Sequence, residues 1–158
     1  MKKTAILTAF HGNQLNNVWK PLTFEMHPID VNEKIGDFVQ LQGCIGCSEE
    51  AKNYILELTS GSIEFLPVFY QDTILYALNV VEVIDCLDEK KSEIEYFPNA
   101  GRIRVIKRYE LKSELLSGKH IFKIPQRIMG TIYVSDDFKN LIEQNRLSGL
   151  TFYKKWEG

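Results

Sequence analysis

The sequence predicts an α+β fold, in which a mainly antiparallel, curved sheet of about eight or nine strands accompanies two main helices. Two segments, about ninety residues apart, begin with a serine and two acids and continue with apolar residues at helical spacing. Most of the remaining chain consists of short runs of branched and aromatic residues separated by polar turns, which is typical of hairpins. No linker rich in glycine, serine or proline divides the chain, so we expect a single domain over residues 1–158.

The two serine-initiated segments predict helices over about residues 48–59 and 135–146. In each, the serine hydroxyl suits the N-cap, where it accepts a hydrogen bond from a free backbone N–H of the first turn. The acidic pair that follows lies at the positive end of the helix. Gly61 and Gly149 come after the helices and suit the left-handed residue that ends a helix. Each helix is then expected to feed a strand, and either a duplication or convergence on one cap chemistry explains the likeness.

The other elements are expected in hairpin order, after an N-terminal strand and loop region over residues 1–34. Strands are predicted over 4–10, 37–41, 63–70, 73–85, 93–97, 102–108, 120–124, 129–134 and 151–156, with a short third helix over about 111–117. A turn at Gln71-Asp72 makes the third and fourth strands a hairpin. Pro67 predicts a bend or an edge position, which leaves room for a homodimer formed edge to edge.

The totals restrict the class of protein. A net charge of −2 gives no global electrostatic argument for binding nucleic acid or an anionic membrane. No apolar run approaches the ~18 residues of a membrane span. Three cysteines are an odd number in a chain long enough to build a core, so we expect reduced thiols in a cytoplasmic protein.

The first candidate for chemistry is the pair Cys44 and Cys47, separated by Ile45-Gly46. Thiolates at this spacing can chelate zinc, but a structural site usually has four ligands, and Cys86 and three histidines are the only other supply. A thiol next to a helix N-terminus can instead be reactive, because its pKa falls there. Buried, inert thiols around a glycine turn are the simpler interpretation. A thiol- or zinc-binding protein that uses Cys44, Cys47 and Cys86 stays an alternative.

Two charged segments are further candidates. The acidic turn over 85–89 has the carboxylate density to bind a divalent cation, but two lysines follow at once, which favours a solvated turn. The strand over 102–108 places Arg102 and Arg104 on one face, where they can bind phosphates or a partner's carboxylates. A small-ligand or nucleic-acid accessory module is therefore another alternative. Cross-strand ion pairs with Glu93 and Glu95 would instead make this an ordinary solvated sheet face.

Catalytic patterns do not occur in the sequence. It holds no nucleophile elbow, phosphate-binding loop, dinucleotide fingerprint or H-E-x-x-H motif. We therefore expect no catalytic residues, no cofactor and no enzyme.

Several segments, taken in order, carry a resemblance. They are SEEAK (48–52), IEFLPV (63–68), YALNV (76–80), VIDCLD (83–88) closed by Ser92, IFKI (121–124), YVSDDFK (133–139), LSGLTF (147–152) and Trp156. Over roughly residues 35–156 this pattern resembles a bacterial family that was first catalogued as a domain of unknown function. The family was later assigned, largely from gene neighbourhood, to immunity proteins of polymorphic toxin and contact-dependent systems. The paired cysteines do not belong to the pattern.

The resemblance implies a non-enzymatic cytoplasmic protein that binds a cognate toxin domain and blocks it. Tight binding of this kind depends on a few aromatic or arginine anchors ringed by polar contacts. The turn after residue 95 offers both residue types, and we expect the partner interface there. Its members are Tyr96, Phe97, Asn99, Arg102 and Arg104. The alternative is a hairpin tip whose phenylalanine is tucked into the core.

Overall fold

A computed structural model describes residues 10–24, 35–41, 43–70 and 72–157. Within them the chain forms two α-helices, α1 (Glu49–Leu56) and α2 (Asp136–Gln144), and nine strands in three sheets. The strands are β1 (Leu22–Phe24), β2 (Phe38–Leu41), β3 (Cys44–Cys47), β4 (Ile63–Tyr70), β5 (Thr73–Val80), β6 (Glu93–Tyr96), β7 (Ile103–Arg108), β8 (Ile121–Phe122) and β9 (Tyr133–Val134). The predicted α+β class is confirmed. The strand predicted over 4–10 lies outside the described residues except for Phe10.

The largest sheet has the strand order β1-β4-β5-β3-β2. β4 and β5 pair antiparallel along their whole lengths, which confirms the predicted hairpin. β1 runs parallel to β4, so the sheet is mixed. The indole N–H of Trp19 donates to the carbonyl of Pro67 at 2.9 Å, and β1 pairs with the three residues that follow. The edge that Pro67 was expected to leave open is therefore covered by the chain itself.

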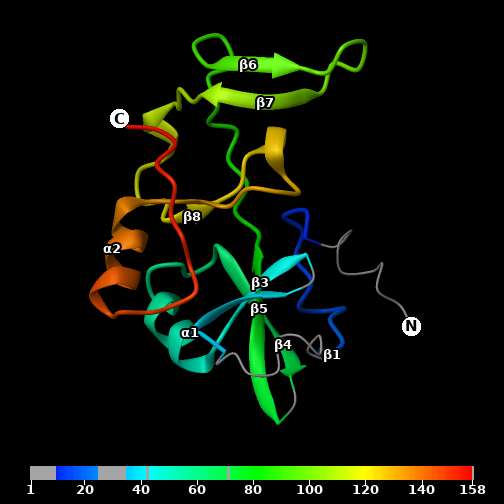
Figure 1. The fold of residues 1–158 in the computed structure, drawn as a ribbon, viewed down its shortest axis with the longest axis vertical. Helices are drawn as coiled ribbons and strands as arrows, with labels where there is room; N and C mark the ends of the chain where they lie inside the picture. Colours follow the sequence, from blue (N-terminus) through cyan, green and yellow to red (C-terminus); the bar gives the residue numbers. More distant parts are fainter. Residues whose placement is uncertain (1–9, 25–34, 42, 71, 158) are drawn as a thin grey trace.

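β5 ends at Val80, whereas the sequence predicts a strand up to Asp85. Beyond β5 the backbone changes partners, because Val81 N–H donates to the Ser62 carbonyl and Ile84 N–H donates to the Lys123 carbonyl. The apolar run continues as a link that rises from the main sheet towards the β6–β7 hairpin (Figure 1).

β3 was not predicted as a strand, since the sequence suggested a glycine turn at Cys44–Cys47. The chain reverses at Gly43, whose φ of 87° is left-handed, and β3 then pairs with β2 on one side and β5 on the other. A Cβ atom at Gly46 would lie 2.6 Å from the Leu41 side chain, so a larger residue there would displace that side chain. The strand that leads into α1 is therefore β3, and the strand predicted over 37–41 forms β2, which precedes it.

Both helices begin at the predicted caps. Ser48 Oγ accepts a hydrogen bond from Ala51 N–H at 3.1 Å, and Ser135 Oγ accepts one from Phe138 N–H at 3.2 Å. The two helices lie side by side along one flank of the molecule (Figure 1). Their buried side chains face the same core cluster.

The helix ends differ from the prediction. α1 ends at Leu56 and α2 at Gln144, so neither Gly61 nor Gly149 directly follows its helix. Arg146 adopts the left-handed conformation after α2, with a φ of 55°. Gly149 instead allows the backbone to pack closely against β2, because a Cβ atom there would lie 1.9 Å from the Phe38 carbonyl oxygen.

The core has three parts. The first lies between the main sheet and the helices, the second on the opposite face of that sheet, and the third between the β6–β7 and β8–β9 sheets. The first cluster consists of Phe38, Cys47, Ala51, Ile55, Ile63, Leu78, Val80, Ile121, Phe138 and Ile142. The second consists of Phe10, Leu41, Cys44, Leu66, Val68, Tyr70, Leu75 and Ala77. The third consists of Cys86, Leu87, Ile106, Tyr109, Phe122, Ile124 and Tyr133.

The strand predicted over 151–156 does not form. Phe152 packs edge-on against Phe138, at 6.5 Å between ring centroids, and Trp156 packs on the third cluster. The C-terminal segment therefore runs as an extended strap from the first cluster to the third (Figure 1). The third helix predicted over 111–117 is reduced to a 3₁₀ turn at Ser113–Leu115, and a second such turn occupies Pro125–Arg127.

Candidate partner-binding surface

The three cysteines lie in three different clusters. Cys44 and Cys47 are three residues apart on a strand, so they project to opposite faces of the main sheet, and Cys86 belongs to the third cluster. Among the described residues, no three histidine, cysteine or acidic side chains are placed to hold a metal ion. Cys44, Cys47 and Cys86 therefore do not converge on a single metal ion.

The thiols also lack activation. Burial raises the pKa of Cys44 to about 11, opposed by the nearby Lys123, and that of Cys47 to about 12, opposed by Lys52. The pKa of Cys86 is raised mainly by burial. Protonated thiols are poor nucleophiles and poor metal ligands. The proximity of Cys47 to the N-terminus of α1 does not outweigh its burial, which keeps this thiol protonated near neutral pH.

The acidic turn over 85–89 is organised as a turn and not as a cation site. Asp88 Oδ1 accepts the backbone N–H groups of Lys90 and Lys91, both at 3.2 Å. Asp85 and Glu89 each accept a hydrogen bond of 2.9 Å from the side-chain amide of Gln126. The carboxylates are thus engaged with backbone and amide donors, as expected for a solvated turn.

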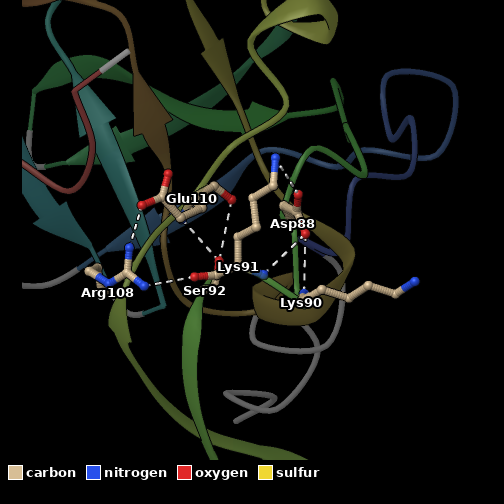
Figure 2. A network of polar contacts seen from close by, with 6 residues as sticks. All are labelled: Asp88, Lys90, Lys91, Ser92, Arg108 and Glu110. Atoms are coloured by element: carbon tan, nitrogen blue, oxygen red, sulfur yellow. Dashed lines mark hydrogen bonds and ion pairs between the residues drawn. The ribbon is translucent and has the colours of Figure 1, made fainter.

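The same turn fixes the base of the β6–β7 hairpin, as Figure 2 shows. Ser92 Oγ accepts from the N–H of Glu110 at 3.0 Å and donates to its carbonyl at 3.3 Å. Arg108 donates to the Lys91 carbonyl at 2.9 Å and forms an ion pair with the Glu110 carboxylate. Asp88 N–H donates to the Glu110 carbonyl at 2.8 Å. These contacts join the two ends of the hairpin and close its base.

One face of the hairpin packs inward. Ile94 and Ile103 are half-buried and Ile106 is buried, and all three pack in the third cluster. Tyr96 follows the same alternation, and its hydroxyl donates to the Glu89 carboxylate at 3.3 Å. Partial desolvation and the Glu89 charge together raise the Tyr96 pKa. Tyr96 is thus exposed but turned towards the body of the protein.

The opposite face carries a ladder of ion pairs. Glu95 lies 3.4 Å from Arg104 and 2.5 Å from Lys107, and Lys107 is also 3.8 Å from Glu93. The hydrogen bond with Lys107 lowers the pKa of Glu95 and raises that of Lys107. The predicted cross-strand pairing of Arg104 with Glu95 is confirmed. Because these four side chains are 37–62% exposed, the pairs contribute little to stability.

The tip of the hairpin presents an aromatic ring and a guanidinium together. Phe97 N–H donates to the Arg102 carbonyl at 2.9 Å, which places the two side chains on the same face. The Arg102 guanidinium lies 5.9 Å from the centre of the Phe97 ring. Asn99 and Gly101 turn the chain with φ values of 63° and 60°. Phe97 is 45% exposed, so the alternative in which it is tucked into the core is wrong.

The five residues predicted as the interface therefore separate. Phe97, Arg102 and Arg104 share the outer face, Asn99 forms the turn, and Tyr96 points to the other side. Lys107 also belongs to the outer face but was not predicted as part of the interface. The pairing register of β6 and β7 shifts after Glu93 and after Glu95. These shifts change which side chains of β7 share a face, and the regular inward-outward alternation of a strand does not predict them.

We name the outer set of side chains the hairpin outer face. It comprises Glu93, Glu95, Phe97, Arg102, Arg104 and Lys107. It is exposed, hydrogen-bonded at its base and mixed in charge, so it can bind a protein surface but offers no converged group for catalysis.

In the described ranges, no helix is both long enough and apolar enough to span a bilayer.

Comparison with known proteins identifies the family. A model described as an immunity protein family (Imm11) matches residues 3–156, which includes the 35–156 region that carries the resemblance and extends close to the first residue. No curated protein matches the sequence. Because the match covers nearly the whole chain, this protein belongs to the Imm11 immunity protein family.

Proposed function

We propose that this protein binds and neutralises a cognate bacterial toxin domain, acting in the cytoplasm and without catalysing a reaction. The observation that carries the proposal is the family match over residues 3–156. An inhibitor of this kind needs a stable scaffold and a specific surface, and the chemistry of the bound toxin can remain entirely the toxin's.

The proposal includes the hairpin outer face as the contact surface. Its support is physical: an exposed phenylalanine beside an arginine is the type of anchor that dominates protein interfaces. The hydrogen bonds at the base of the hairpin join its two strands in the absence of a partner. Pre-organisation lowers the entropy lost on binding, which favours high affinity.

Co-expression tests the proposed function. The partner to test is the C-terminal domain of a toxin whose gene is found immediately upstream, produced from an inducible promoter. We expect growth to be restored when this protein is made first, and an inactivated toxin domain to co-purify with it. An unrelated folded protein expressed at the same level is the control. Absence of both rescue and co-purification, with both proteins folded, would contradict the proposal.

A further inference from the structure

The hairpin outer face holds one charge that the fold does not neutralise. Arg104 and Lys107 share Glu95, and Arg108 at the base pairs with Glu110. Arg102, by contrast, has no carboxylate within ion-pair distance in the described part of the chain. The segment from 96 to 108 contains four basic residues and no acidic one. The unmatched positive charge is therefore concentrated at the tip.

The position of Arg102 prepares it for a partner. Its side chain is exposed and lies against the ring of Phe97, which limits the freedom of a side chain that is otherwise flexible. Its N–H donors make no hydrogen bond to other described residues, so the planar fork is free for a bidentate acceptor. The neighbouring ring provides apolar area beside that fork.

We infer that the toxin surface bound by this hairpin is acidic, with a carboxylate that pairs with Arg102 at the rim of an apolar recess that receives Phe97. The inference rests on the proposed function, since it describes the partner of the same surface. Arg102 is then the residue that selects the partner, because a toxin without this carboxylate would leave a desolvated guanidinium unpaired.

A nucleic acid fits the same surface less well. Polyanion binding uses several free cations along a groove, with aromatic rings that stack on bases. Here Arg104 and Lys107 are already neutralised, and the carboxylates of Glu93 and Glu95 lie on the same face and would repel phosphates. A single free guanidinium suits one carboxylate better than a chain of phosphates.

The test measures the affinity for the inactivated toxin domain, by calorimetry at several salt concentrations. Reversing the charge in Arg102→Glu should weaken binding by about 100-fold or more, as for a central anchor. Arg102→Lys keeps the charge but loses the fork, and should weaken binding by about 10-fold. The matched control is Lys90→Glu, an exposed charge reversal at the other end of the hairpin, which should change affinity by less than about twofold.

The outcomes are distinct. If wild-type protein does not bind the folded toxin domain, the proposed function fails and this inference fails with it. If wild-type protein binds and Arg102→Glu binds equally well or more tightly, only the inference is overturned. Replacing an acidic residue of the toxin by arginine should restore binding of Arg102→Glu, which would identify the partner carboxylate. Tight binding of a single-stranded oligonucleotide that is lost in Arg102→Glu would favour the nucleic-acid alternative and overturn the inference.

Arg102→Gln provides a second variant that removes the charge without introducing repulsion. It should weaken binding by about 10-fold or more, and its urea midpoint should equal that of the wild type, because the side chain is exposed. Unchanged affinity of this variant would also overturn the inference.

Discussion

Glu64 shows how one buried polar side chain organises a segment far away in sequence. Its side chain is 7% exposed, within a strand that is otherwise apolar. The carboxylate accepts hydrogen bonds from Leu15 N–H at 2.6 Å, Asn16 N–H at 3.2 Å and the Asn79 amide at 2.8 Å. Asn79 also donates to the Asn13 carbonyl at 2.8 Å. The segment that precedes Trp19 is thus held on the main sheet by buried side chains.

Removing this carboxylate is therefore expected to be costly. Glu64→Ala leaves three donors without their acceptor and should lower the free energy of unfolding by about 3 kcal/mol, measured by urea denaturation. Glu93→Ala removes an exposed carboxylate of the same kind and should change it by less than about 0.5 kcal/mol. Equal effects of the two substitutions would show that the Glu64 contacts do not hold the N-terminal segment in solution.

The buried thiols of Cys44 and Cys47 predict how the stability of the protein depends on pH. Burial raises the pKa of Cys44 to about 11 and that of Cys47 to about 12, whereas the pKa of both thiols in the unfolded state is near 9.0. Above pH 9 the unfolded state therefore loses the thiol protons that the folded state still holds. The thiols therefore contribute stability that is complete below pH 9 and is lost as the pH rises towards 11–12. The unfolding midpoint should fall over this range in the wild type, and less in the double variant Cys44→Ala and Cys47→Ala. In the native protein at pH 8, these thiols should react with a disulfide reagent far more slowly than after denaturation. Rapid native reaction would contradict their burial.

Among the loops between elements, three glycines differ in backbone conformation and in the space around their Cα atoms, so substitutions there distinguish the two effects. Gly149 and Gly118 both have positive φ, of 96° and 67°, but only Gly149 lies against another element, the Phe38 carbonyl of β2. Gly130 has neither restriction. The loop after α2 covers the edge of β2, because Phe38 N–H donates to the Ser148 carbonyl at 2.9 Å. Substitution by alanine at the three positions should therefore have graded effects.

Alanine at Gly130 should leave the free energy of unfolding within about 0.5 kcal/mol of the wild type. Alanine at Gly118 should lower it by about 1 kcal/mol, the cost of a left-handed residue. Alanine at Gly149 adds a collision with β2 and should lower it by about 3 kcal/mol or more. Thermal and urea unfolding of the three variants measure this order. A Gly149 variant no less stable than the Gly118 variant would show that the loop does not pack on β2.

The same elements show what a single sequence can predict. The helix starts at Ser48 and Ser135 were predictable because capping depends on neighbouring residues only. β3 was not predictable, because Cys44–Cys47 becomes a strand through pairing with distant β5. In the candidate surface, the Arg104–Glu95 pair follows from hairpin proximity. The inward direction of Tyr96 depends on Glu89 and on bulges that leave no local signal.

At the scale of the whole molecule, the C-terminal strap contacts two of the three core clusters. Phe152 packs on the first cluster and Trp156 on the third, which also supports the hairpin outer face from below. Trp19 packs edge-on against Phe10 in the second cluster, at 6.3 Å between ring centroids. The two tryptophans of the chain therefore report on two separate parts of the core.

This arrangement predicts that damage at one end spreads to the other. Trp156→Ala should lower the free energy of unfolding by about 3 kcal/mol, because a large half-buried ring is lost from the third cluster. Tyr153→Ala alters the same strap at a side chain that is 76% exposed. It should change the free energy of unfolding by less than about 0.5 kcal/mol. In Trp156→Ala the remaining indole is Trp19, so its fluorescence follows the second cluster alone. If the molecule unfolds as one unit, this fluorescence and the far-UV circular dichroism should shift to the same lower urea concentration. A Trp19 transition that stays at the wild-type midpoint would show instead that the second cluster unfolds independently, and that the strap does not couple the hairpin to the main sheet.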